Sequence, residues 1–117
     1  MKKVLVIDDQ EQLREIVSMG LTHTGFEVIQ ASSAAEAETT LSNWQPDLIL
    51  CDLHLEDGDG FSVLEWVRGR NETVMTPFVM MTGLIDEFPM ETMKPDAYLS
   101  KPFELQILFE TVQRLLN

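Results

Sequence analysis

The chain has 117 residues, 44% of them hydrophobic, which is enough for one domain with a buried core and leaves little room for a second. Its 20 acidic and 8 basic residues give a formal charge of −12, which argues against direct binding to nucleic acid or to an anionic membrane surface. A single cysteine excludes an internal disulfide, and no apolar run suits a signal peptide or a membrane span, so we expect a cytoplasmic protein.

Apolar runs that end in acidic residues predict two strands. Residues 4–7 are followed by the pair Asp8 and Asp9, and residues 48–51 are followed by Asp52. Uninterrupted apolar runs of this length are typical of strands that helices cover on both faces, as in parallel sheets. A charged side chain is costly inside such a sheet, so we expect Asp52 at the carboxyl end of its strand, where open α/β sheets gather functional residues.

Helical periodicity and capping signals place the other elements. Ser33 with Glu36 three residues later forms a capping-box pattern, which starts a helix whose apolar face runs to Trp44. Flanking prolines restrict the helix before the last strand to a short segment near residues 86–93. The other predicted helices cover residues 11–24, 61–70 and the region from residue 104, and the other predicted strands cover residues 26–31, 77–82 and 97–100.

This alternation of strands and helices predicts an α/β fold of the flavodoxin-like, doubly wound type. Right-handed crossovers would give a five-stranded parallel sheet with helices on both faces and a short or irregular fourth helix. Of the common doubly wound strand orders, we expect the flavodoxin-like order 2-1-3-4-5. The side chains capable of chemistry then all lie at the carboxyl ends of strands. They are Asp8, Asp9, Asp52, Thr82 and Lys101.

These side chains have the parts of a phosphorylation site. Three carboxylates held close together repel one another, and a hard divalent cation such as Mg²⁺, which takes carboxylate, water and phosphate oxygens, relieves that repulsion. Lys101 offers a positive charge and Thr82 a hydroxyl donor to phosphate oxygens. A carboxylate oxygen of Asp52 could attack phosphorus to form an acyl phosphate.

The motifs together resemble the receiver domain of response regulators in two-component signalling, over all of residues 1–117. Besides the paired acids, they are Asp52 after the third strand, Thr82 after the fourth, and Lys101–Pro102 after the fifth, with Tyr98 three residues earlier. The resemblance implies that Asp52 accepts a phosphoryl group from a histidine kinase or a histidine phosphotransfer protein. It also implies a conformational switch in which Thr82 closes on the phosphoryl group while Tyr98 turns inward.

The resemblance further implies a metal site and a type of activity. Asp9, Asp52 and the backbone carbonyl of His54 would hold Mg²⁺, with Asp8 acting through a bound water. The domain would catalyse its own phosphorylation and slow dephosphorylation and would not turn over a separate substrate. It would signal to a downstream protein target or an output domain.

Two positions bear on how such a switch would behave here. Glu56 stands where the family commonly has a proline, which puts the stiffness of that loop in doubt but not the chemistry. Leu84 lies two residues after Thr82, beside the expected path of a hydrolytic water. Leucine can neither donate nor accept a hydrogen bond, so we expect slow loss of the phosphoryl group.

Other functions remain as alternatives. An aspartate-nucleophile phosphatase or phosphotransferase of the haloacid dehalogenase kind would need a second acid two residues after the nucleophile, where this chain has His54. A flavin or nucleotide site would need glycines after the first strand, and this chain has none there. A degenerate receiver that only binds protein partners is the third alternative, and the complete set of acids, threonine and lysine argues against it.

Overall fold

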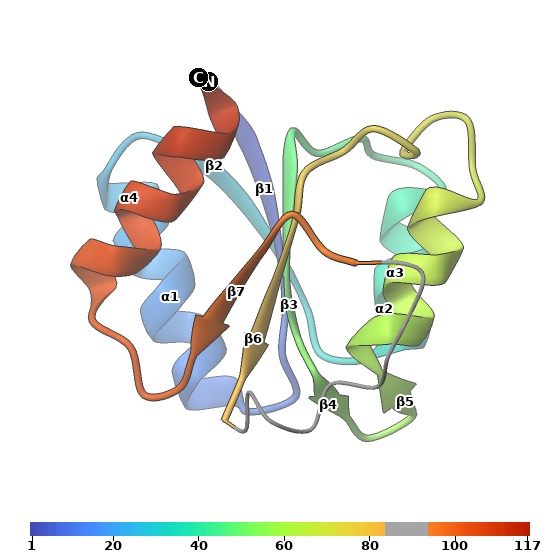
Figure 1. Ribbon diagram of the computed structural model, residues 1–117, viewed down its shortest axis with the longest axis horizontal. Helices are drawn as coiled ribbons and strands as arrows, with labels where there is room; N and C mark the ends of the chain where they lie inside the picture. The colour runs from blue at the N-terminus through green and yellow to red at the C-terminus, as the bar shows by residue number, and fades with distance from the viewer. Residues whose placement is uncertain (84–93) are drawn as a thin grey trace.

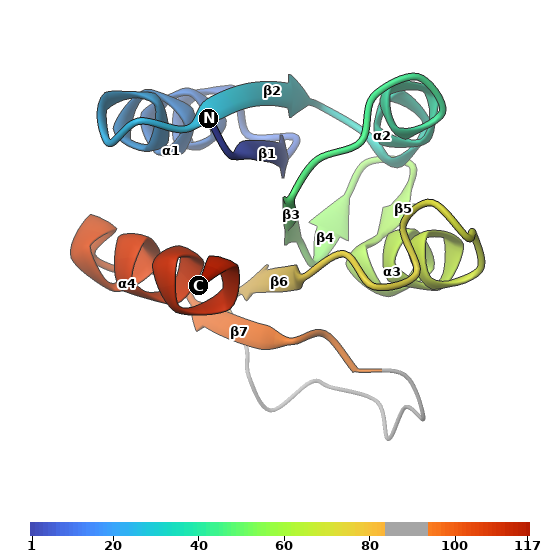
Figure 2. The same cartoon turned by 90° about the horizontal axis from the view of Figure 1, so that it is seen from above.

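The computed structural model, which describes residues 1–83 and 94–117, has three layers with a parallel sheet in the middle (Figure 1). The sheet has five strands in the order β2-β1-β3-β6-β7, and every neighbouring pair is parallel. Figure 2 shows α1 and α4 covering one face of this sheet and α2 and α3 covering the other. The predicted doubly wound order is therefore confirmed, with β6 and β7 as the fourth and fifth strands.

The boundaries of most elements lie within two residues of those that the sequence predicts. The predicted short helix near residues 86–93 lies outside the described residues. The strands are β1 Lys3–Ile7, β2 Glu27–Ala31, β3 Leu48–Asp52, β4 His54–Leu55, β5 Gly58–Asp59, β6 Phe78–Thr82 and β7 Ala97–Ser100. The helices are α1 Glu11–His23, α2 Ala34–Leu41, α3 Gly60–Arg68 and α4 Leu105–Leu116.

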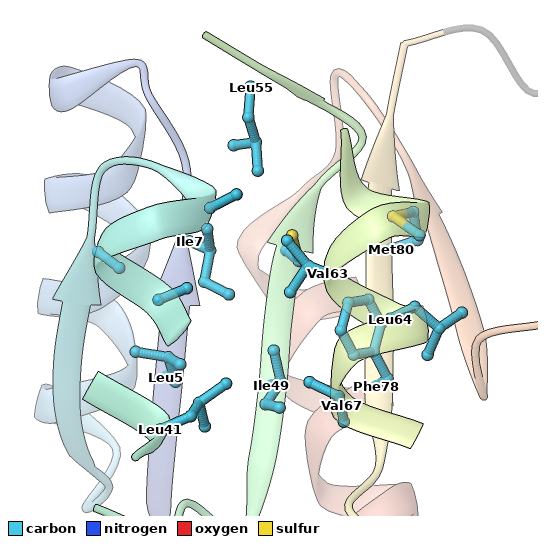
Figure 3. Close-up of a cluster of buried hydrophobic side chains, with 14 of the residues drawn as sticks. Leu5, Ile7, Leu41, Ile49, Leu55, Val63, Leu64, Val67, Phe78 and Met80 are labelled. Atoms are coloured by element: carbon cyan, nitrogen blue, oxygen red, sulfur yellow. The ribbon is translucent and has the colours of Figure 1, made fainter. Parts of the chain in front are cut away.

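The hydrophobic core lies on both faces of the sheet because successive side chains of a strand point to opposite faces. Leu5 and Ile49 belong to the cluster under α2 and α3, which Figure 3 shows, and Val4 and Leu48 belong to the cluster under α1 and α4. All residues of β3 are buried, as a central strand of a parallel sheet requires. In the described part of the chain, no helix is both long and apolar enough to cross a membrane.

The second helix is shorter than the sequence predicts. It ends at Leu41, so Trp44 lies beyond it and does not extend its apolar face, although this ring still packs against the core under α2 and α3. The side chains of Ser42 and Asn43 donate hydrogen bonds to helix carbonyls four residues earlier, at 2.9 and 3.2 Å. Polar side chains that bond the backbone in this way compete with further helical turns, which accounts for the early end.

The predicted capping box at the start of α2 forms only in part. The Ser33 hydroxyl accepts a hydrogen bond from the Glu36 amide at 3.1 Å, as predicted. The Glu36 carboxylate accepts from the Ser32 amide at 2.9 Å, one residue before the position that a reciprocal box would use. Ser33 therefore caps the helix, and the Glu36 side chain bonds the residue that precedes this cap.

The loop after β3 contains structure that the sequence did not indicate. β4 and β5 pair as a short antiparallel hairpin, and Asp59 then caps α3 by accepting a hydrogen bond from the Ser62 amide at 2.8 Å. Gly60 begins α3 at a point of close approach, because a Cβ atom there would lie 2.8 Å from the Asp52 carbonyl oxygen and 2.3 Å from the Met80 sulfur. Glycine is therefore needed to seat α3 against the end of β3.

Candidate phosphorylation site

Three carboxylates converge at the carboxyl ends of β1 and β3. These strands are neighbours, with Ile7 paired to Cys51, so the residues that follow this pair lie side by side. One carboxylate oxygen from each of Asp8, Asp9 and Asp52 lies within 4.8 Å of the others. Asp8 is fully buried and Asp52 is 6% exposed, whereas Asp9 is half-buried. The cluster therefore opens to solvent on the side of Asp9.

Backbone contacts hold Asp8 in place. Its amide donates to the Ala31 carbonyl at 3.1 Å, and its carboxylate accepts from the Gln10 amide at 2.9 Å. The Arg14 guanidinium, which the sequence did not single out, donates to the Asp8 carbonyl at 2.8 Å from the first turn of α1. In the sequence, only its position six residues after Asp8 could have suggested that Arg14 contacts this site. The carboxylate of Asp8 is thus fixed by the start of α1.

Lys101 reaches the acidic cluster from the loop between β7 and α4. Its ammonium lies 2.9 Å from Oδ1 of Asp52 and 3.3 Å from Oδ2 of Asp8. Its own backbone amide donates to the Thr82 carbonyl at 2.7 Å, which attaches the lysine to the end of β6, and its peptide bond to Pro102 is cis. One ammonium is thus shared between two of the three carboxylates.

The surroundings of Asp52 disfavour its charged form. Burial raises the pKa of the Asp52 carboxyl from its ordinary value of 3.8, and the charges of Asp8 and Asp9 add to that rise. The Lys101 ammonium opposes the rise through its hydrogen bond and its charge, without cancelling it. A further cation beside Asp52 would favour the ionised carboxylate that nucleophilic attack requires.

Thr82 and Tyr98 lie on neighbouring strands, Thr82 at the carboxyl end of β6 and Tyr98 two residues before the end of β7. Thr82 ends β6 and is fully buried, and Tyr98 lies in β7 opposite Met80. Because Met80 and Thr82 are two residues apart in a strand, the side chains of Thr82 and Tyr98 belong to the same face of the sheet. The Tyr98 ring packs against the core under α2 and α3, and burial raises the pKa of its hydroxyl.

His54 and Cys51 flank Asp52 without joining the carboxylate cluster. His54 begins β4, and its side chain is exposed. The Cys51 side chain is fully buried and donates to the Asp52 carbonyl at 3.2 Å. Burial, followed by the charge of Asp52, raises the pKa of this thiol well above its ordinary value, so it stays neutral. Leu84, which we expect near a hydrolytic water, lies outside the described residues.

Comparisons with family models and with curated proteins agree on one family. Residues 4–113 match the family described as response regulator receiver domain. The transcriptional regulatory protein GltR of Pseudomonas aeruginosa is 30% identical over 99% of this chain and 49% of that protein. The alkaline phosphatase synthesis transcriptional regulatory protein PhoP of Bacillus subtilis is 32% identical over the same shares. The chain thus spans about half the length of these curated relatives.

Solved structures resemble the chain along its whole length. The chemotaxis response regulator CheY4 of Vibrio cholerae is 30% identical, with a TM-score of 0.88 and coverage of 99% of both chains. The response regulator TrrA of Thermotoga maritima, solved in complex with Mg²⁺ and BeF, is 26% identical, with a TM-score of 0.90 and coverage of 99% of this chain and 100% of that one. The similarity therefore extends from sequence motifs to the complete fold.

Proposed function

The chain belongs to the response regulator receiver domain family, and from this premise we propose that it is a Mg²⁺-dependent switch that is phosphorylated on Asp52. The observation that carries the proposal is the contact of one ammonium, that of Lys101, with the carboxylates of both Asp52 and Asp8 at the open edge of the sheet. Residues 1–117 would form one such domain.

The chemistry follows from the positions of these side chains. The phosphoryl donor would be a phosphorylated histidine of the partner protein. A carboxylate oxygen of Asp52 forms a bond to phosphorus while the bond between phosphorus and the histidine nitrogen breaks. That nitrogen keeps the electron pair and takes up a proton. Lys101 would stabilise the charge on the transferred phosphoryl oxygens, because it already lies 2.9 Å from the attacking carboxylate. Thr82 would donate its hydroxyl to a phosphoryl oxygen once that group is in place, and Tyr98 would follow on the same face of the sheet.

The residues at the edge of the sheet fit a divalent cation. Of the three carboxylates, which lie within 4.8 Å of one another, Asp8 and Asp52 contact Lys101, and this leaves uncompensated negative charge at the half-buried side of Asp9. Asp9, Asp52 and the His54 carbonyl would hold Mg²⁺, with Asp8 acting through a water. Mg²⁺ would supply charge compensation for the phosphoryl oxygens.

The partners follow from the same proposal. A histidine kinase or a histidine phosphotransfer protein would supply the phosphoryl group. Because the curated relatives named above are transcriptional regulators about twice as long as this chain, an output domain or a separate protein target would receive the signal. The formal charge of −12 makes the receiver itself a poor ligand for nucleic acid.

Phosphorylation with a small donor tests the proposal. Acetyl phosphate with Mg²⁺ should add one phosphoryl group to the wild-type chain, measured by intact mass, and EDTA should prevent the addition. Asp52→Asn should remain unmodified, and Glu56→Gln, an exposed acid of the same loop, should label like wild type. Labelling of Asp52→Asn would contradict the proposal. Continuous release of phosphate far beyond one equivalent, at a rate typical of a phosphatase, would favour the haloacid dehalogenase alternative.

A further inference from the structure

The tip of the loop after β3 is bonded to a distant helix. Oδ1 of Asp57 accepts a hydrogen bond from the Ala34 amide and Oδ2 accepts one from the Ala35 amide, both at 2.9 Å. These amides belong to the first turn of α2, 23 and 22 residues earlier in the chain. One carboxylate thus joins the loop that follows Asp52 to the helix that follows β2.

The remainder of the loop is held by contacts of a different kind. At its base, the Gly60 amide donates to the Leu53 carbonyl at 2.7 Å. In its middle, β4 pairs with β5, and Leu55 is only 8% exposed and belongs to the core under α2 and α3 (Figure 3). The contacts of Asp57 add an anchor at the tip, where Glu56 and Gly58 stand on either side of Asp57 and both are exposed. Glycine allows the backbone more conformations than other residues do, so the contacts of Asp57 restrict the part of the loop that is least restricted by its own sequence.

We propose that Asp57 is a positioning residue for the metal site: by bonding the start of α2 it holds residues 53–60, and with them the His54 carbonyl, in the conformation that completes the site. The inference rests on the proposed function, since it takes the His54 carbonyl as a ligand. Asp57 itself would not touch the metal.

The negative charge of the Asp57 carboxylate strengthens its contact with the start of α2. The first amides of a helix lack partners within the helix and carry the positive end of its dipole, so a carboxylate there is stabilised in its charged form. The hydrogen bonds from Ala35 and Ala34 accordingly lower the pKa of Asp57. Ser33 already caps the Glu36 amide of the same helix, so Asp57 satisfies different amides and does not compete with that cap.

Asp57 is also linked to the acidic cluster through the end of β2. Ala31, which ends β2 just before α2, accepts the hydrogen bond from the Asp8 amide at 3.1 Å. The segment that Asp57 binds therefore lies next to the residue that positions Asp8. Hydrogen bonds therefore connect the ends of β1 and β2 through Asp8 and Ala31, and the start of α2 to the loop after β3 through Asp57.

Metal affinity in a pair of variants with the same charge tests the inference. Asp57→Ala and Asp57→Asn both remove the charge, but asparagine keeps a carbonyl oxygen that can accept one of the two hydrogen bonds. We expect Asp57→Ala to weaken Mg²⁺ binding about tenfold, as loss of groups that orient metal ligands commonly does. Asp57→Asn should weaken it less. The readout is the dissociation constant from titration of backbone amide NMR signals with MgCl₂.

Ser33→Ala is the matched control, since it removes the other cap of α2 without touching the loop. It should lower the melting temperature while leaving the Mg²⁺ dissociation constant within twofold of wild type. Equal Mg²⁺ affinity in wild type and both Asp57 variants would overturn the inference and leave the proposed function intact. Failure of wild type to bind Mg²⁺ would overturn both. If Asp57→Ala does not fold, affinity of Asp57→Asn equal to that of wild type overturns the inference, and weaker affinity supports it.

Discussion

Asp52 is held in surroundings that disfavour its charged form, and this should make the stability of the fold depend on pH. Its pKa is raised in the folded chain, mainly by burial. The folded state therefore binds this proton more tightly than the unfolded state does. Ionisation of Asp52 then destabilises the fold as pH rises from the ordinary value toward the raised one, and the loss is complete above that window.

Asp52→Asn should remove this pH dependence. We expect the free energy of unfolding of wild type, relative to that of the variant, to fall as pH rises above 3.8 in metal-free buffer and then to level off. Urea unfolding of both proteins across a pH series gives the difference directly. A difference that stays flat through the whole series would mean that Asp52 has the same affinity for protons in both states.

Residues at the ends of strands could be anticipated from the sequence, and residues that contact distant segments could not. Asp8, Asp52 and Lys101 each follow a predicted strand, so the topology of a parallel sheet is enough to bring them to one edge. Asp57 is different, because the amides that it binds lie 22 and 23 residues earlier, and no local pattern connects them. In the sequence Asp57 is one of three acids in the run Glu56-Asp57-Gly58-Asp59, and nothing distinguishes it from the other two.

A side-chain clamp, formed by Arg68 and Asp96, joins α3 to the starts of β6 and β7. Asp96, which precedes β7, accepts hydrogen bonds from the Arg68 guanidinium at 2.8 Å and from the Phe78 amide at 2.7 Å. Arg68 also donates to the Thr76 carbonyl at 2.6 Å. The Arg68 side chain is 17% exposed and the Asp96 side chain 43%, so the pair is shielded from solvent mainly on the arginine side. Such a contact stabilises more than a pair that is open to water.

Asp96→Ala should therefore lower the free energy of unfolding by about 1–2 kcal/mol, because it removes a charged acceptor from two donors. Glu72→Ala is the matched control: its carboxylate lies 3.7 Å from the Arg70 guanidinium in an exposed pair, so its loss should cost less than about 0.5 kcal/mol. Urea unfolding measures both values. Equal losses in the two variants would show that the shielded clamp adds nothing.

Element boundaries show where sequence patterns end and tertiary contacts take over. The apolar spacing that extended the second predicted helix to Trp44 was real, since this ring does pack on the core. The chain nevertheless leaves the helix at Leu41, because Ser42 and Asn43 bond the carbonyls of the last turn. The hairpin of β4 and β5 could not be predicted from the sequence either, since two-residue strands are too short to give a periodic pattern.

For the whole molecule, the parallel sheet with helices on both faces followed from general rules that require no detailed contacts. Alternating strands and helices with right-handed crossovers leave few arrangements, and the observed order β2-β1-β3-β6-β7 is the one expected. The same rules place negative charge at one edge of a chain whose formal charge is −12. Because these carboxylates repel one another, we expect a cation bound there to stabilise the fold.

Mg²⁺ should accordingly raise the melting temperature, by an amount that corresponds to about 2.7 kcal/mol when its concentration is about 100 times its dissociation constant. Asp9→Asn should blunt this rise, because it removes one proposed ligand. It should also stabilise the metal-free chain by about 1 kcal/mol, since it relieves repulsion among carboxylates that lie within 4.8 Å of one another. Thermal unfolding with and without MgCl₂ measures both effects.

General screening of a chain with a charge of −12 would also stabilise it, so two controls separate that effect from binding at the cluster. NaCl at matched ionic strength should raise the melting temperature less than MgCl₂ does. Glu56→Gln removes the same charge from an exposed position and should keep the full response to Mg²⁺. If Asp9→Asn and Glu56→Gln respond alike, the cation acts on overall charge and the carboxylate cluster does not bind it. A metal-free Asp9→Asn protein that melts below wild type would show that the Asp9 carboxylate makes a stabilising contact that outweighs its repulsion by Asp8 and Asp52.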